Sequence, residues 1–375
     1  MDLDKLINTP DDMLLTEFKG HTRSFLRNEK KKEIAMRKKN GTIDKLVFDK
    51  KSSKLNEEKK LLEKELKLQI SINEKLQKEQ AAILSLKKKP AYHEILPSKE
   101  VDSEAIAVLV ASDWHSEEEV KGSTVNNMNE FNLEICKYRS EKFFQNSLRL
   151  LKMTSKDVEI KNVILALLGD FITGNIHEEN VETALLQPID AVWFAYERIT
   201  NGIDFLLKNS DYNFTVICKN GNHSRITRKQ RHATDSGNSL EGFMYKVLAQ
   251  RYEKESRIQF VIEDGYLTYF KVYDMMLRFH HGHSIRYSGG SGGITIPARK
   301  AIAQWNKIKR ADLDVFGHWH QKFDGEDFII NGSLIGWNSY AISIKADFQK
   351  PQQTFFLIDK NRGKTIVAPI LLNGH

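Results

Sequence analysis

The strongest constraint on the fold lies after residue 104, where short apolar runs each end at a cluster of polar side chains. The clearest runs span residues 105–112, 163–168, 214–218 and 313–316. Runs of this length predict buried strands. Amphipathic stretches at residues 133–153, 181–207 and 239–255 predict helices between them. This alternation predicts an α/β protein whose strands carry polar side chains at their carboxyl ends.

Later apolar runs predict further strands, mostly antiparallel. They span residues 258–263, 267–280, 328–331, 354–358 and 364–372. The mean hydropathy of −0.48 is typical of a globular protein, and no apolar stretch approaches the roughly 20 residues that a membrane span needs. Residues 1–10 also lack the apolar core of a signal peptide. We therefore expect a cytoplasmic protein without a membrane partner.

Metal-ligand residue types cluster at five of the predicted strand ends. The clusters are Ser112-Asp113-Trp114-His115, Gly169-Asp170, Gly221-Asn222-His223, His281-Gly282-His283 and Gly317-His318-Trp319-His320. In an extended segment, residues i and i+2 face the same side. This alternation predicts that Asp113 and His115 converge, as do His318 and His320, while the two tryptophans point into packing.

The ligand chemistry favours borderline divalent metals. Aspartate, asparagine and histidine side chains suit Mn²⁺, our first choice, and also Fe²⁺, Zn²⁺ or Ni²⁺. The two cysteines, Cys136 and Cys218, lack the spacing of a zinc or redox motif and cannot form a disulfide framework. We expect both thiols to be buried among apolar side chains.

The order and spacing of the five motifs resemble those of the calcineurin-like metallophosphoesterases, from Asp113 to His320. The resemblance implies an α/β fold, a β-sandwich flanked by helices, with a pair of divalent ions about 3.5–4 Å apart at one edge. It also implies seven metal ligands and a proton donor. By resemblance, Asp113, His115 and His320 would hold one metal, Asn222, His281 and His318 the other, and Asp170 both, while His223 would protonate the leaving oxygen.

Two departures from the family pattern bear on substrate and mechanism. Protein phosphatases of this superfamily have an Asp-Arg pair after Gly-Asp and an arginine before Gly-Asn-His. Here Phe171-Ile172-Thr173-Gly174 and Lys219-Asn220 stand in those places, which disfavours a protein phosphatase. Many relatives also follow Gly-Asn-His with an acidic residue that orients the imidazole. This chain has Ser224 instead, so His223 needs another partner.

Residues near the motifs suggest how substrate is bound. Cations follow Asn222 and His223 directly, and we expect them on the rim of the metal site, where they would contact phosphates. These cations are Arg225, Arg228, Lys229 and Arg231, followed by His232. The glycine-rich residues 289–293 are either a loop that offers N–H groups to phosphate or a plain connection. His177 is expected at the surface or at a helix start, and His280 and His283 are the alternatives to His281 as ligand.

The N-terminal 100 residues hold all of the excess positive charge, with 24 lysines and arginines against 17 aspartates and glutamates. We predict a basic helical region at 1–52, stopped once at Asn40-Gly41, then a long helix at 53–89 and a linker at 90–104. The metallophosphoesterase domain would occupy 105–375. The long helix either forms a coiled coil, giving a homo-oligomer, or packs on that domain.

These features favour a metal-dependent phosphoesterase that acts on nucleic acid, DNA more than RNA. The nearest type is the SbcD-like repair nuclease and related phage metallophosphoesterases, for which Asp170, Asn222 and His223 would be catalytic and an ATPase partner would be expected. Two alternatives stay open. One is a small-molecule phosphatase or cyclic-nucleotide phosphodiesterase, and the other is a non-catalytic DNA-binding scaffold.

Overall fold

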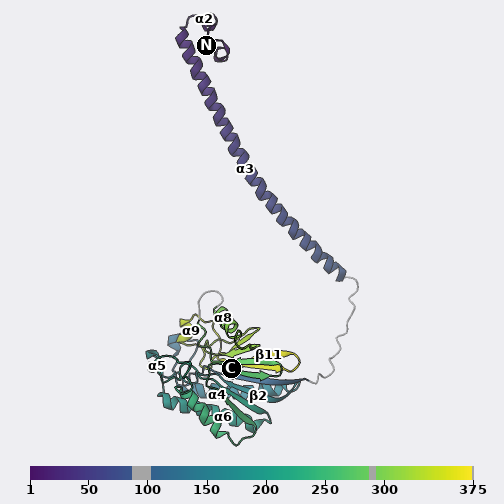
Figure 1. Ribbon diagram of the computed structural model, residues 1–375, viewed down its shortest axis with the longest axis vertical. Helices are drawn as coiled ribbons and strands as arrows, with labels where there is room; N and C mark the ends of the chain where they lie inside the picture. The colour runs from purple at the N-terminus through teal and green to yellow at the C-terminus, as the bar shows by residue number, and fades with distance from the viewer. Residues whose placement is uncertain (87–102, 287–292, 374–375) are drawn as a thin grey trace. The chain divides into compact units, whose positions relative to one another are not determined.

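The computed structural model describes residues 1–86, 103–286 and 293–373. Most of the predicted linker at 90–104 and most of the glycine-rich residues 289–293 lie outside these ranges. The chain separates into two compact units, Met1–Pro97 and Ser98–His375. Each unit is described by itself (Figure 1).

The N-terminal unit consists of two short helices and one long one. Helices α1 (Leu3–Asn8) and α2 (Leu14–Glu17) fold against the start of α3 (Arg23–Leu86). Their contact is a small apolar cluster of Leu6, Leu14 and Leu26, with Phe18 packed against it. The Asp2 carboxylate caps α1 by accepting from the backbone N–H groups of the first turn.

Helix α3 runs for 64 residues without interruption, so the predicted helix stop at Asn40-Gly41 was wrong. Glycine inside a helix costs only about 0.5–1 kcal/mol relative to alanine. Gly41 keeps a helical backbone there instead of the left-handed conformation of a helix end. Leu55, Leu62 and Leu76, which are spaced by seven and fourteen residues as in a coiled-coil repeat, are exposed in the single chain. The coiled coil stays a prediction.

Among the described residues, no helix combines the length and the apolar character that a bilayer span requires. This agrees with the hydropathy of the sequence.

The larger unit is built on two β-sheets. The six-stranded sheet has the order β11-β10-β1-β2-β3-β4. Its strands are β1 (Glu104–Ala111), β2 (Glu159–Leu167), β3 (Asn213–Cys218), β4 (Ile258–Ile262), β10 (Gln352–Asp359) and β11 (Gly363–Leu371). Strands β1 to β4 are parallel, whereas β10 pairs antiparallel with both β1 and β11. The carboxyl ends of β1, β2 and β3 therefore lie along one edge.

The second sheet has five strands in the order β5-β6-β7-β9-β8. They are β5 (Thr268–Val272), β6 (Met275–Phe279), β7 (Leu313–Phe316), β8 (Phe323–Asp324) and β9 (Phe328–Ile330). Among the later strands, expected to be mostly antiparallel, β4 pairs parallel with β3 and β9 pairs parallel with β7. Helix α7 (Leu240–Arg251) precedes β4 and helix α8 (Thr295–Trp305) precedes β7. Such helical crossovers return the chain to the same end of a sheet and make the strands parallel.

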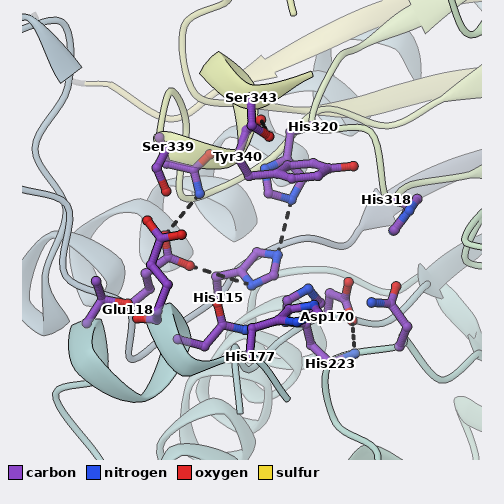
Figure 2. A pocket seen from close by; sticks show the side chains of 15 residues that line it. His115, Glu118, Asp170, His177, His223, His318, His320, Ser339, Tyr340 and Ser343 are labelled. Atoms are coloured by element: carbon purple, nitrogen blue, oxygen red, sulfur yellow. Dashed lines mark hydrogen bonds and ion pairs between the residues drawn. The ribbon is translucent and has the colours of Figure 1, made fainter. Parts of the chain in front are cut away.

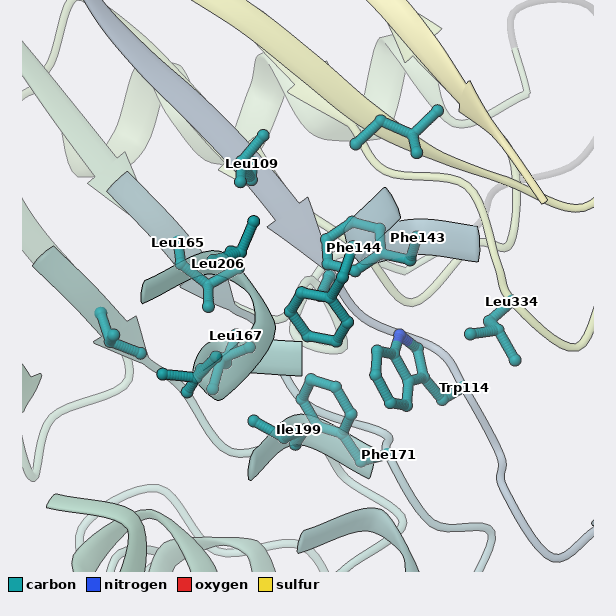
Figure 3. Packing of buried hydrophobic residues seen from close by; sticks show 14 of the residues in the cluster. Leu109, Trp114, Phe143, Phe144, Leu165, Leu167, Phe171, Ile199, Leu206 and Leu334 are labelled. Atoms are coloured by element: carbon teal, nitrogen blue, oxygen red, sulfur yellow. The ribbon is translucent and has the colours of Figure 1, made fainter. Parts of the chain in front are cut away.

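The apolar side chains form layers that confirm the predicted fold, a β-sandwich flanked by helices. Val108, Ile164 and Phe279 belong to a cluster shared by the two sheets. A larger cluster packs the outer face of the six-stranded sheet against α4 (Leu133–Thr154), α6 (Pro188–Asn209) and α7, with Trp114, Phe143, Phe144 and Phe171 at its centre (Figure 3). Helix α8 covers the second sheet on the opposite side (Figure 1).

The predicted helix at 181–207 is two helices in the structure. Helix α5 (Glu178–Thr183) ends before Pro188, which begins α6. Proline fits the first turn of a helix, where its missing N–H has no intrahelical partner, but not the interior. The connections also hold the one-turn helix η1 (Gly122–Val125) and helix α9 (Ser339–Ser343).

Gly202 permits the close approach of α6 and α4 and gives a test of this packing. A Cβ at residue 202 would overlap the ring of Phe144. We expect Gly202→Ala to lower the free energy of unfolding by about 1–3 kcal/mol, because overpacking forces the helices apart. Urea unfolding followed by tryptophan fluorescence measures this, since all five tryptophans lie in the larger unit.

Gly237→Ala is the matched control, because a Cβ at residue 237 would meet no atom within 4 Å. Its unfolding free energy should stay within about 0.5 kcal/mol of the unsubstituted chain. Equal stabilities for the two variants would contradict the close packing of α4 and α6.

Candidate metal centre

The polar residues that follow five strands meet at one edge of the sandwich. Asp113 and His115 follow β1, Asp170 follows β2, and Asn222 follows β3 in the first sheet. The histidines come from the second sheet, where His281 follows β6, and His318 and His320 follow β7. All seven predicted ligands are brought together, and Figure 2 shows several of them around a cavity.

The backbone is left-handed at five of the seven ligand positions, so an extended segment in which residues i and i+2 face the same side does not explain the convergence. Instead, left-handed residues bend the chain sharply just beyond the strands. The φ values are 57° at Asp113, 46° at His115, 54° at Asp170, 73° at His318 and 53° at His320. Such angles are uncommon outside glycine and concentrate at functional sites.

Trp114 and Trp319, which separate the paired ligands, are buried in apolar clusters as predicted. The two ring systems therefore anchor the loops from which the ligands project.

The first group of ligand atoms is formed by Asp113, His115 and His320. Their ligand atoms all lie within 4.8 Å of one another. The Nε2 atoms of His115 and His320 are 3.1 Å apart, and Nε2 of His320 is 3.6 Å from Oδ1 of Asp113. Two nitrogens on one ion, each about 2.0–2.1 Å from it, would be about 3.0–3.4 Å apart. The donor set and spacing therefore fit a divalent cation.

The second group joins Asp170 with His281 and His318, again within 4.8 Å of one another. Nε2 of His281 lies 2.8 Å from Oδ2 of Asp170. Asn222 lines the adjoining cavity, and its Oδ1 is buried without a hydrogen-bond partner among the described residues. An unsatisfied buried oxygen fits a missing metal ligand. Asp170 also groups with His115 and His223, so it lies within reach of both sets.

Burial and charge set the protonation of these groups. Burial opposes ionisation of Asp170, but His281 and His223 outweigh it and hold the Asp170 pKa well below its usual range. For His281, burial lowers the pKa, yet the Asp170 carboxylate prevails and raises it to about 9. Burial lowers the pKa of His115 and His318 well below the usual range. Neutral imidazole is the form that binds metal, so His115 and His318 are ready to bind, whereas a bound ion would release the proton of His281.

Neighbouring groups hold the imidazoles in orientation. The Nδ1 atom of His281 is 2.7 Å from the carbonyl oxygen of Leu168, and Nδ1 of His115 is 3.1 Å from Oγ1 of Thr173. Both contacts leave Nε2 facing the ligand group. Contacts of this kind fix the tautomer of a metal-binding histidine.

His223 finds in the fold the partner that its neighbour Ser224 does not supply. Its Nδ1 lies 2.9 Å from the carbonyl oxygen of Thr173, and its backbone N–H donates to Oδ1 of Asp170 over 2.9 Å. Ser224 instead donates to the buried carboxylate of Glu241, which also accepts from the backbone N–H groups of Phe171 and Gly221. Glu241 thus holds the loops after β2 and β3 together.

The cavity at this edge has a volume of about 270 Å³. Residues of α5 and α9, including Glu179 and Tyr340, also line it, and the Tyr340 ring packs edge-on against His320 (Figure 2). His177 lines the cavity from the start of α5, in agreement with its predicted position. The four predicted substrate-binding cations do not line it. Arg225 is half-buried and donates to the carbonyl oxygen of Asn222, while Arg228, Lys229 and Arg231 are not among the lining residues.

His280 and His283 lie outside the group around Asp170. Nε2 of His280 is 3.3 Å from Oδ1 of Asp314, and its ring stacks on Phe316. The His283 ring packs edge-on against Tyr266. The geometry therefore favours His281 over its two neighbours as the ligand.

Comparison with solved structures finds similar architectures at low sequence identity. One is a hypothetical protein from Pyrococcus horikoshii, with 11% identity, a TM-score of 0.36, and 72% of this chain and 89% of that chain covered. Another is vacuolar protein sorting 29 from Cryptosporidium parvum, with 15% identity, a TM-score of 0.28, and coverage of 71% and 97%. A third, from Streptococcus pneumoniae, is described as a predicted phosphoesterase, with 10% identity, a TM-score of 0.28, and coverage of 72% and 98%.

A scan of protein-family models and a search of curated protein sequences each found no match.

Gly221 tests the arrangement, because a Cβ there would overlap the Asp170 carboxylate. We expect Gly221→Ala to weaken Mn²⁺ binding by about 10–100-fold, the usual effect of disturbing the support of a ligand. Equilibrium dialysis followed by metal analysis measures it. Gly265→Ala is the control, because the nearest atom to its Cβ would be 3.9 Å away. Unchanged binding in Gly221→Ala would argue against Asp170 as a ligand.

Proposed function

We propose that this chain is a two-metal-dependent phosphoesterase. The observation that supports this most is the meeting of two ligand groups, Asp113-His115-His320 and Asp170-His281-His318, at the edge where both sheets end. Divalent ions bound there would neutralise phosphate oxygens and lower the pKa of a water molecule. The chain's own part is to hold the ions, exclude bulk water and move a proton.

Asp170 is suited to contact both ions. One of its oxygens accepts from the His223 backbone N–H and the other faces Nε2 of His281. These contacts fix the plane of the carboxylate between the two groups. Asn222 adds an oxygen ligand that has no other partner among the described residues.

His223 is suited to deliver a proton to the leaving oxygen. Its Nδ1 is held by the Thr173 carbonyl, so Nε2 is the nitrogen left for substrate, and the ring lines the cavity. The side-chain amide of Asn180 donates to the same Thr173 carbonyl oxygen, over 3.5 Å. Burial lowers the pKa of His223, while the Asp170 carboxylate and the Thr173 carbonyl oppose that shift and favour the protonated imidazole that a general acid needs.

The substrate we propose is a phosphodiester of nucleic acid, DNA in preference to RNA, with Mn²⁺ as the first candidate metal. Support comes from the excess of positive charge in residues 1–100, where polyanions would be attracted. Arg228, Lys229 and Arg231 follow the Asn222-His223 loop and would contact a polymer that extends beyond the cavity. An oligomer formed through α3 and an ATPase partner belong to this proposal.

The cavity itself favours a second candidate, a small-molecule phosphatase or cyclic-nucleotide phosphodiesterase. Its volume is about 270 Å³, and no lysine or arginine is among the described residues that line it. In such a site, the metal ions alone would bind a single phosphate group. Cleavage of labelled DNA, compared with turnover of a cyclic nucleotide, separates the two candidates.

Asp170→Asn tests the chemistry. Removing the charge between the two ligand groups should lower Mn²⁺-dependent cleavage of labelled DNA by at least about 10²-fold. The matched control is Asp274→Asn, which makes the same change at an exposed residue and should cleave at the original rate. Equal cleavage by both variants would remove Asp170 from the mechanism.

Neutralising cations on α3 tests the role of the N-terminal unit. Lys31, Lys38 and Lys39 are exposed, and their joint replacement by glutamine should reduce the slope of log affinity against log salt by about 3. Fluorescence anisotropy with labelled duplex DNA measures the slope. The control replaces exposed lysines of the larger unit, Lys152, Lys208 and Lys254, for the same loss of charge. Equal slopes for the two triple variants would contradict specific use of α3.

A further inference from the structure

A buried chain of hydrogen bonds leads from the predicted metal ligand His115 to the start of α9. Nδ1 of His115 is 3.1 Å from Oγ1 of Thr173, and that hydroxyl donates to Oε2 of Glu118 over 3.2 Å. Oε1 of Glu118 accepts from Nδ2 of Asn338 over 3.0 Å. All four residues are buried, with exposed fractions of at most 9%. Two loops and one helix cap are therefore joined behind one imidazole.

We propose that Glu118 is a positioning residue that fixes the tautomer of His115, through Thr173 and under the control of Asn338. The proposal rests on the metal-dependent function argued above. It concerns which nitrogen of His115 carries a proton, and so whether Nε2 is free to bind an ion.

The donor-to-acceptor direction of this hydrogen-bond chain is set at α9. Asn338 is the N-cap of this helix, and its Oδ1 accepts from the backbone N–H of Ala341 over 3.2 Å. The oxygen of the amide is committed to that contact, so the NH₂ group must face Glu118. An amide whose orientation would otherwise be ambiguous is thus assigned by the helix cap.

The orientation of Asn338 then determines which atoms of Glu118, Thr173 and His115 donate and which accept. Burial raises the pKa of Glu118 to about 7, and above that pH its ionised carboxylate only accepts, from Asn338 at one oxygen and from Thr173 at the other. The single hydroxyl hydrogen of Thr173 is used in that bond, and its oxygen must accept from His115. The proton of neutral His115 consequently lies on Nδ1. Nε2 is left bare, and it faces Nε2 of His320 over 3.1 Å.

Thr173 is itself held in place by an adjacent carboxylate. Oε1 of Glu117 accepts from the backbone N–H groups of Thr173 and Gly174 over 2.8 and 2.7 Å. The Thr173 hydroxyl therefore cannot drift from His115 without breaking these bonds. Nδ1–H of histidine paired with a hydroxyl and a carboxylate is an arrangement that orients metal ligands.

Glu118→Gln should reverse the donor-to-acceptor direction of this hydrogen-bond chain. Because Asn338 still presents NH₂, the carbonyl oxygen of the introduced glutamine must face it, and the new NH₂ group faces Thr173. The hydroxyl hydrogen then turns towards His115, whose proton moves to Nε2 and blocks the metal. We expect one of the two Mn²⁺ sites to weaken by about 10–100-fold, measured by isothermal titration calorimetry on the full chain.

The double variant Glu118→Gln/Asn338→Asp should restore binding. Aspartate caps a helix as well as asparagine does, so the introduced aspartate still accepts from Ala341. Its second oxygen accepts from the NH₂ group of the introduced glutamine, which turns the glutamine carbonyl oxygen back to Thr173. The net charge equals that of the unsubstituted chain. We expect Mn²⁺ affinity within about threefold of the original, a recovery that loss of packing alone would not produce.

The outcomes separate this proposal from the one on which it rests. If the unsubstituted chain binds no divalent ion, the metal-dependent function fails. If it binds two ions, and Glu118→Gln either binds both equally well or is not rescued by Asn338→Asp, the tautomer proposal is overturned. Thermal unfolding without metal shows whether each variant folds.

A second pair of variants tests the tautomer of His115 if Glu118→Gln does not fold. Thr173→Ser keeps the hydroxyl and should retain both sites, whereas Thr173→Val removes it and should weaken one site. Equal Mn²⁺ affinities for these two variants would also overturn the proposal.

Discussion

The Asp170 carboxylate is the charge around which the site is arranged. Burying an unpaired carboxylate is costly, so the fold must surround it with partners. It receives the His223 backbone N–H and the His281 imidazole, and His115 stands close by. The neighbouring Gly169 and Gly221 allow the loops after β2 and β3 to cross at contact distance, since a Cβ on either would strike the other loop. The close crossing of the two loops thus brings the His223 backbone N–H to the buried Asp170 carboxylate, which needs such a partner.

Thr173 shows how one residue can serve two histidines. Its carbonyl oxygen holds Nδ1 of His223, and its hydroxyl holds Nδ1 of His115. Both rings thereby present Nε2 to the same space, although they follow different strands. The rings of His115 and His223 are perpendicular, with centroids 4.8 Å apart. Whatever moves this loop changes both the ligand and the proton donor.

Much of the larger unit could be predicted from its sequence because buried strands have apolar runs of the right length. The ends of β1, β2 and β3 were located within a few residues, and so were the polar clusters beyond them. The reason for their convergence was missed, because left-handed backbone at residues such as His115 or His320 depends on tertiary contacts and leaves no local pattern. Helix α3 was cut at Gly41 because a local stop signal was given more weight than the long helical sequence around it.

The supporting residues of the site lie beyond what one sequence can show. Glu118 and Asn338 are 220 positions apart, and Phe171 and Glu241 are 70 apart, yet each pair shares a buried hydrogen bond. Neither belongs to a motif with fixed spacing. The cations expected on the rim are close to Asn222 and His223 in sequence but are not among the residues that line the cavity, so their contact with substrate stays a prediction. Sequence adjacency is a weak guide within a long loop.

The ligand groups draw on both sheets, and this has a mechanical consequence. Asp113 and His115 belong to one sheet, and His320 belongs to the other. An ion bound by all three would add a link between two layers that already meet through apolar contact and through hydrogen bonds such as that from His318 to Asp113. Removing it would leave the layered interior intact and loosen only the corner where the strands end. Metal binding would then determine both the catalytic competence of the site and the packing of that corner.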